Sequence, residues 1–227
     1  MTFLFENRAS DSSFVETIWH AQSERAGSFI SLAASHWEMV VTRYQDRTSF
    51  TVRGPETKAT PLHYQWIGAE WLGIRFKLGA FLPNLPPSKL LDRRDVNLPQ
   101  ASSRSFWLQG SAWEFPTFEN ADTFVDRLVR EGLIVRDPVV QAVLEGQPQE
   151  LSVRAVQYRF LQATGLAHRT VQQIERARYA LTLLQQGASI PDTVYQAGYF
   201  DQPHLSRALK RFAGQTPAQI ARLSTSE

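Results

Sequence analysis

The stretch that decides the fold is SIPDTVYQAGYFDQPHLSRALKRFAGQTP, residues 189–217. Ser189 and Asp192 have the spacing of a capping box at the start of a helix. Gly198 is placed to end that helix, and Asp201 is placed to cap a second helix after a short turn. A helix, a glycine turn and a second helix predict a helix-turn-helix.

The second helix of this stretch has two distinct faces. Its inner face carries Leu205, Leu209 and Phe212. The outer face is polar and basic, at the i, i+3, i+4, i+7 spacing of one helix side, and carries Pro203, Ser206, Arg207 and Lys210. Such a face suits DNA phosphates and base edges, although a surface helix hairpin with a solvated polar face has the same pattern.

An analogous unit precedes this one. Asp137-Pro138 can start a helix that ends near Gly146, and residues 151–165 predict a second helix capped by Ser152. Its outer stripe is Arg154, Gln157, Tyr158 and Leu161. A helical segment over 166–187 connects the two units. Its residues from Thr170 to Gln186 would span roughly 26 Å, which can place two recognition helices in successive major-groove segments.

The first half of the chain predicts strands instead. Short β-branched and aromatic runs occupy 27–34, 36–44, 47–54, 70–79 and 105–116, and all six Trp lie in this half. We expect a barrel- or sandwich-like β-rich domain whose rings form the core; the alternative is that some rings line a pocket for a small effector. A helix over 119–133 is expected to pack on the sheet, with a dimerisation surface as its second interpretation.

Charge divides the chain in the same way. Residues 151–227 hold 9 basic and 4 acidic groups, a net +5, which leaves 15 and 18 for residues 1–150, a net −3. The fold class predicted is α+β and multidomain: a β-rich regulatory domain over 1–116, a helix and linker over 117–136, and an all-α double helix-turn-helix domain over 137–227. The last segment is expected to fold and bind DNA alone.

Composition narrows the remaining classes. Of 227 residues none is Cys, and no apolar run is long enough to span a membrane. The first residues lack the pattern of a signal peptide, so a cytoplasmic protein is expected. His36 and Glu38 could donate two metal ligands, but no third is evident, so neither a metal nor a cofactor is predicted.

The C-terminal motifs resemble a known family. The segments LSVRAVQYRFLQATGL, QQIERARYALTLL and SIPDTVYQAGYFDQPHLSRALKRFAGQTP are similar to the DNA-binding domain of the AraC/XylS family of bacterial transcription regulators. The resemblance covers about 137–224 and rests most firmly on the final G-Y-x-D-Q-x-H-L-S-R-x-x-K-R-x-x-G-x-T-P pattern.

The resemblance implies that the second helix of each unit lies in the major groove. The residues it implies as base readers are Arg154, Gln157 and Tyr158 in the first unit and Gln202, Pro203 and Arg207 in the second. Those better suited to phosphate contacts are Ser152, Thr170, His204 and Lys210.

Three positions depart from the family pattern. Tyr158 stands where a basic residue is usual, Pro203 replaces a polar residue, and Ala167 occupies a common hydroxyl N-cap.

The function predicted is therefore a sequence-specific transcription regulator, with activation favoured because activators dominate the family, and not an enzyme. The expected partners are double-stranded promoter DNA, RNA polymerase, a small-molecule effector and a second copy of the chain, without a membrane. Two alternatives remain: an enzyme with a β-barrel domain fused to a DNA-binding tail, and a constitutive DNA-binding protein whose first half serves association.

Overall fold

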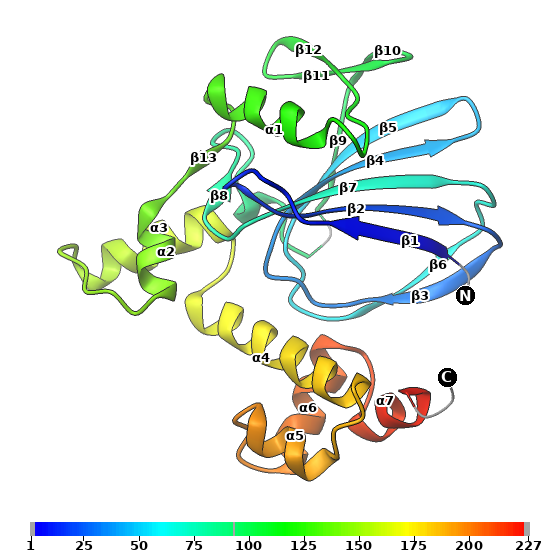
Figure 1. The fold of residues 1–227 in the computed structure, drawn as a ribbon. Helices are drawn as coiled ribbons and strands as arrows, with labels where there is room; N and C mark the ends of the chain where they lie inside the picture. The colour runs from blue at the N-terminus through cyan, green and yellow to red at the C-terminus, as the bar shows by residue number, and fades with distance from the viewer. Residues whose placement is uncertain (1–2, 93, 225–227) are drawn as a thin grey trace. The chain divides into compact units, whose positions relative to one another are not determined.

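The computed structural model describes residues 3–92 and 94–224, which form two compact units (Figure 1). The sheet unit consists of the described residues up to Gly27, residues 36–55 and residues 63–166. The helical unit consists of residues 28–35, residues 56–62 and the described residues from Ala167 onward. The chain therefore passes between the units five times, and two short segments of its first third belong to the helical unit.

The sheet unit is built on a six-stranded antiparallel sheet with the order β1-β2-β7-β4-β5-β9. Its strands are β1 (Phe3–Arg8), β2 (Val15–Ser23), β4 (Glu38–Tyr44), β5 (Arg47–Arg53), β7 (Glu70–Phe76) and β9 (Val96–Leu98). A tight turn at Gln45 and Asp46 joins β4 to β5, and Gln45 has a φ of 52°, in the left-handed region. The predicted strands 36–44, 47–54 and 70–79 are confirmed as β4, β5 and β7.

Three smaller strand groups complete the β structure. One is the sheet β10 (Gln100–Ser102), β11 (Ser105–Leu108) and β12 (Ser111–Glu114). The others are the pair β8 (Ala80–Phe81) with β13 (Val135–Arg136) and the pair β3 (Gly27–Ser31) with β6 (Thr60–Tyr64). A short 3-10 helix, η1 (Pro87–Lys89), begins directly after Pro86. The prediction of one or two strands in 105–116 is confirmed by β11 and β12.

The core of the sheet unit lies between one sheet face, the β11–β12 hairpin and helix α1 (Ala121–Arg130). Met39 and Val41 of β4 and Phe50 and Val52 of β5 belong to this core and alternate along their strands, as the period of a strand requires. Val40 and Thr51 between them are buried as well. Phe50 on β5 packs against Phe106 on β11 with ring centroids 4.2 Å apart, and Phe124 of α1 meets both rings edge-on. This packing of a second sheet over the first is sandwich-like.

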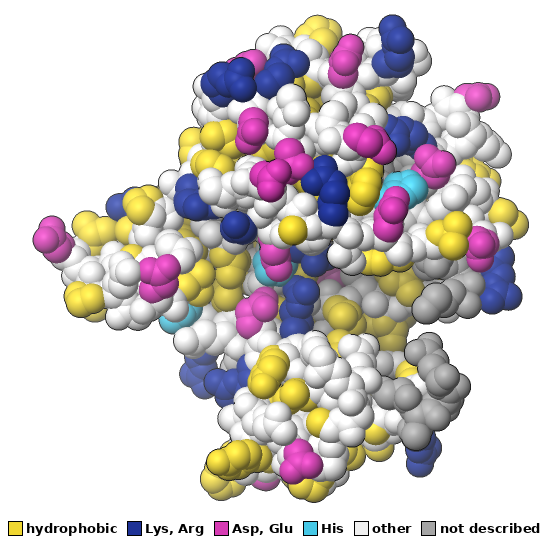
Figure 2. Space-filling model, viewed as in Figure 1, with side chains coloured by type: hydrophobic (Ala, Val, Ile, Leu, Met, Phe, Trp, Pro, Cys, Tyr) yellow, Lys and Arg dark blue, Asp and Glu magenta, His cyan; other side chains and the backbone are white. Residues whose placement is uncertain are grey.

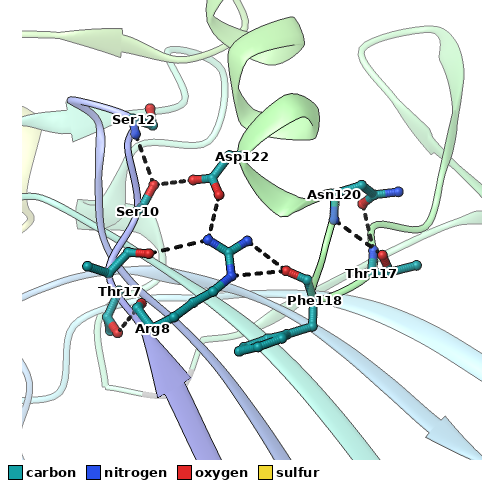
Figure 3. A network of polar contacts seen from close by, with 9 residues as sticks. Arg8, Ser10, Ser12, Thr17, Thr117, Phe118, Asn120 and Asp122 are labelled. Carbon is teal, nitrogen blue, oxygen red and sulfur yellow. Dashed lines mark hydrogen bonds and ion pairs between the residues drawn. The ribbon is translucent and has the colours of Figure 1, made fainter.

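A polar network fixes the start of α1 to β1 (Figure 3). The Arg8 guanidinium donates to the Asp122 carboxylate at 2.6 Å and to the Phe118 carbonyl at 2.7 Å, and the Ser10 hydroxyl also donates to Asp122. Burial alone would raise the pKa of the Asp122 carboxyl, but the hydrogen bonds from Ser10 and Arg8 outweigh it and leave this pKa below its usual range. Asn120 is the N-cap predicted, yet its side chain accepts from the Thr117 N–H instead of from the helix.

Six helices follow α1. The sheet unit contains α2 (Pro138–Leu144) and α3 (Val153–Thr164), and the helical unit contains α4 (His168–Gln185), α5 (Ile190–Gln196), α6 (Gln202–Phe212) and α7 (Pro217–Ser224). The α+β class, β-rich first and helical second, is thus confirmed. The compact units, however, divide after Leu166, whereas the sequence pattern places a border near residue 137. Independent folding of 137–227 stays a prediction.

Strands β1, β2 and β6 were not predicted, nor were the short strands β8, β9, β10 and β13, whereas β3 lies in the predicted run 27–34. β1 lies at the edge of the sheet. Its consecutive residues Leu4 and Phe5 are both exposed, so no alternation of buried and exposed residues marks this strand. β2 carries a register shift between Val15 and Thr17, which breaks its alternation.

Candidate nucleic-acid interface

Helices α5 and α6 form the second helix-turn-helix, with the caps that the sequence predicts. The Ser189 hydroxyl accepts from the Asp192 N–H at 3.2 Å, and the Asp201 carboxylate accepts from the His204 N–H at 2.7 Å. Gly198 ends α5 with a φ of 67°, a conformation that costs glycine little. Together these residues fix where each helix begins and ends.

The two faces of α6 are as predicted. Leu205 and Leu209 are fully buried in a core that includes Leu181 and Leu184 of α4, and Phe212 is also buried. On the opposite side five predicted site residues are exposed: Gln202, Pro203, His204, Arg207 and Lys210. The helix therefore presents its predicted DNA-binding residues to solvent.

These exposed side chains differ in what else they bind. The Arg207 guanidinium has no hydrogen bond or ion pair with any residue in 3–92 or 94–224, so it can make a bidentate contact. The Lys210 ammonium donates to the Gly214 carbonyl at 3.3 Å, beyond the end of the helix. The His204 ring lies edge-on to Tyr199 with centroids 5.1 Å apart.

Tyr199 carries a polar group in the core of this unit. Its ring is buried, with the Arg176 guanidinium 5.8 Å from its centroid, and its hydroxyl has no hydrogen-bond partner within the described part of the chain. Burial raises the pKa of this hydroxyl, and the charge of Arg176 offsets the increase only in part.

Helices α2 and α3 form the first helix-turn-helix. The Asp137 carboxylate caps α2 by accepting from the Val139 N–H at 2.9 Å, and it also receives the Arg159 guanidinium at 2.8 and 2.9 Å. Ser152 caps α3, since its hydroxyl accepts from the Ala155 N–H at 3.3 Å. Gly165 ends α3 with a φ of 75°.

The exposed face of α3 is more apolar than that of α6. Arg154, Gln157 and Tyr158 are exposed, as predicted, and Tyr158 has 63% of its surface accessible. Val153 and Leu161 are exposed beside them. Arg154 is the one cation among the exposed residues of α3, because Arg159 is half-buried in its pair with Asp137.

Helix α4 begins without a side-chain cap at Ala167, as the departure from the family pattern predicts. Thr170 is half-buried in its first turn. The 18 residues of α4 correspond to about 27 Å at about 1.5 Å per residue.

Two large exposed side chains in the second unit were passed over in the sequence. Tyr195 of α5 and Phe200 of the α5–α6 turn expose 87% and 91% of their surface. Both residues come shortly before the first residue of α6 in the sequence. Aromatic residues next to the predicted polar face of α6 are the signal that could have marked them as candidates for this surface.

Charge on the strand-rich part is mixed. On the face drawn in Figure 2, basic and acidic side chains are interspersed there, with no broad field of one sign.

His36 and Glu38, the two residues that could donate metal ligands, contact other side chains. His36 Nδ1 lies 3.1 Å from a Glu16 carboxylate oxygen, and Glu38 accepts from the Trp19 indole at 3.2 Å. In the ranges that the structure describes, no three His, Cys, Asp or Glu side chains gather as they would to hold a metal ion. Across those same ranges, no helix is long and apolar enough to cross a membrane.

Comparison with known proteins bears on the helical region. Residues 150–222 match the family model described as a helix-turn-helix domain; α2 lies outside this match. No curated protein matches.

Solved structures of ToxT from Vibrio cholerae also align with the chain. One is 11% identical and covers 98% of this chain and 99% of its own, with a TM-score of 0.41. A second, with an unsaturated fatty acid bound, is 10% identical and covers 99% and 96%, with a TM-score of 0.42.

The chain contains two helix-turn-helix units, and residues 150–222 match the model of a helix-turn-helix domain. Both findings support the class of DNA-binding transcription regulators. More narrowly, residues 150–222 form a helix-turn-helix domain of the AraC type.

Proposed function

We propose that this protein binds a specific promoter sequence in double-stranded DNA through α3 and α6 and activates transcription there. The observation that carries the proposal is the outer face of α6. It combines an exposed guanidinium without a partner among the described residues, Arg207, with a helix N-terminus fixed by Asp201. Recognition helices contact base edges with their N-terminal residues, which is where these groups lie.

The proposed roles on α6 follow from side-chain chemistry. Arg207 donates two hydrogen bonds to guanine O6 and N7, and Gln202 pairs with adenine N6 and N7. Pro203 offers apolar contact to a thymine methyl group. His204 and Lys210 bind phosphates, which position the helix without recognising sequence.

The proposed roles on α3 differ because its face is more apolar. Arg154 and Gln157 are the polar base readers, and Tyr158 contacts bases through its ring and hydroxyl. Ser152 and Thr170 lie at the starts of α3 and α4, where backbone N–H groups also favour a phosphate.

The sheet unit is proposed to carry the regulation, by a small-molecule effector or a partner. A second copy of the chain and RNA polymerase are the proposed protein partners, and the cytoplasm is the proposed location. The dimer surface proposed on α1 would be polar, because its apolar residues Phe124, Val125 and Leu128 face the core and Asp126 and Arg130 are exposed. No catalytic role is proposed.

Selection of bound sequences from random DNA by the full-length chain tests this function. Enrichment of one sequence with two recognised segments supports it, and a change of affinity on addition of cell extract supports an effector. A chain that enriches no sequence contradicts the proposal.

A further inference from the structure

Two segments from the first third of the chain, 28–35 and 56–62, belong to the helical unit; we call them the clamp segments. They are joined to each other as antiparallel neighbours. β3 pairs with β6, and Ala34 and Glu56 exchange backbone hydrogen bonds at 3.0 and 2.9 Å.

The clamp segments bind the C-terminal end of α6. The last carbonyls of an α-helix have no partner within the helix. Here the Ala33 N–H donates to the Phe212 carbonyl and the Ala59 N–H donates to the Arg211 carbonyl, both at 2.8 Å. The Arg211 guanidinium donates in return to the Thr57 carbonyl at 3.4 Å. The end of the recognition helix is thus completed by residues more than 150 positions upstream.

The chain just after α6 is packed equally closely. A Cβ placed on Gly214 would lie 3.0 Å from Cγ2 of Ile30 and 3.4 Å from Cβ of Ala59. At the end of the clamp segment 28–35, the Ser35 hydroxyl donates to the Glu175 carboxylate of α4 at 2.5 Å. The clamp segments therefore hold α6 and α4 at once.

This contact leaves the DNA-binding face open. The clamp segments meet α6 at Arg211 and Phe212, whereas Gln202, Pro203 and Arg207 are exposed in its first two turns. Each clamp segment is continuous at both ends with the sheet unit, through the peptide bonds after residues 27, 35, 55 and 62. A displacement of the sheet-unit residues next to these peptide bonds would be carried along the backbone of the clamp segments to the end of α6.

We propose that the clamp segments are a positioning element for the second recognition helix, with Ala33 and Ala59 as positioning residues whose N–H groups set the orientation of α6. This inference rests on the proposed function of α6 in DNA binding. It adds that specific recognition requires residues of the clamp segments that touch no DNA.

The absence of Cys allows a direct test by crosslinking. The 3.4 Å between the Ala59 Cβ and a Cβ at Gly214 is just below the range of a disulfide. Gly214 has a φ of 73°, where a Cys is strained, so a small backbone shift is needed for the pair Ala59→Cys and Gly214→Cys to join α6 to its clamp on oxidation. The oxidised chain should bind its selected duplex within about twofold of the reduced chain, because the crosslink holds α6 where recognition needs it. Each single Cys variant is the control for thiol effects.

The complementary variant is Ala33→Pro, which removes one donor to α6. We expect it to lower affinity for the selected duplex by up to about tenfold, the value of one lost hydrogen bond, and to leave affinity for a scrambled duplex unchanged. Ala26→Pro, in an exposed loop of the sheet unit, is the matched control. Adding the Cys pair to Ala33→Pro and oxidising it should restore specific affinity, which separates lost positioning from failed folding.

Other results would overturn the proposal. One is a Cys pair that does not crosslink, and another is an oxidised chain that releases the selected duplex. A third is an Ala33→Pro chain that binds the selected duplex like the parent. The last is a loss of specific affinity in the Ala33→Pro chain that oxidation of the added Cys pair does not restore. A parent chain that binds no DNA at all would instead overturn the proposed function, and the positioning role with it.

Discussion

The two helix-turn-helix units share an architecture but present different chemistry. α6 exposes Arg207, Lys210 and Arg211, whereas α3 exposes Arg154 with Val153 and other apolar side chains. Cations supply the salt-dependent part of DNA affinity, and apolar side chains contribute mainly by contact with thymine methyl groups. The comparison teaches that one architecture can present two surfaces. If both helices bind DNA as proposed, we expect α6 to supply most of the electrostatic affinity and α3 to supply less polar contacts.

The two helix-turn-helix units also differ in which residues of the first half of the chain contact them. In the sheet unit, the Asp137 N–H at the start of α2 donates to the Gly79 carbonyl at 2.9 Å, and a Cβ on Gly165 after α3 would lie 2.8 Å from the Pro87 carbonyl carbon. In the helical unit, the clamp segments hold α6. Each recognition helix therefore depends on a different part of the first half of the chain.

The largest effect is expected from the core of the second unit. Leu205→Ala removes a fully buried side chain and should lower the free energy of unfolding by about 2–5 kcal/mol, measured by denaturant titration. The matched control is Leu161→Ala on α3, where the side chain is 41% exposed and the change should stay within about 0.5 kcal/mol. Equal effects of the two substitutions would mean that the inner face of α6 is misassigned.

Base recognition is the next largest effect. Arg207→Ala should cost about 1–3 kcal/mol in binding to the selected duplex and relax preference at one base pair, because a bidentate contact is lost. Arg154→Ala, its counterpart on α3, should relax preference at a different base pair. If Arg207→Ala binds the selected duplex as tightly as the parent, the recognition face of α6 has been placed wrongly.

A smaller and opposite effect is expected at Tyr199. Its buried hydroxyl loses water without gaining a hydrogen bond among the described residues, so Tyr199→Phe should raise the free energy of unfolding by about 1 kcal/mol. The raised pKa keeps the hydroxyl protonated in the folded chain to higher pH than in the unfolded chain. The parent should therefore lose stability as pH rises above the ordinary tyrosine pKa of about 10, and the Phe variant should lose less. A parent and variant with parallel stability profiles up to high pH would count against this.

The smallest effect concerns Lys210, a proposed phosphate contact. Lys210→Ala should weaken selected and scrambled duplexes alike and reduce the slope of log affinity against log salt by about one. Gln202→Ala, which removes no charge, is the control and should leave the slope unchanged. A loss confined to the selected duplex would make Lys210 a base reader.

Sequence patterns predicted what depends on local spacing. The caps at Ser152, Ser189 and Asp201 and the buried stripe of α6 follow from residue types a few positions apart, and the structure confirms them. The contacts of Ala33 and Ala59 with α6 could not be predicted, because they use backbone N–H groups that every residue except proline carries. The assignments of individual side chains to bases and phosphates stay predictions.

The most direct test of the central claim, that α3 and α6 bind DNA, is the affinity of the full-length chain for its selected duplex across a range of salt concentrations. We predict a straight line of log affinity against log salt, falling with a slope of about −0.9 for each phosphate neutralised. An affinity that does not change between low and physiological salt would contradict a DNA-binding role for these helices.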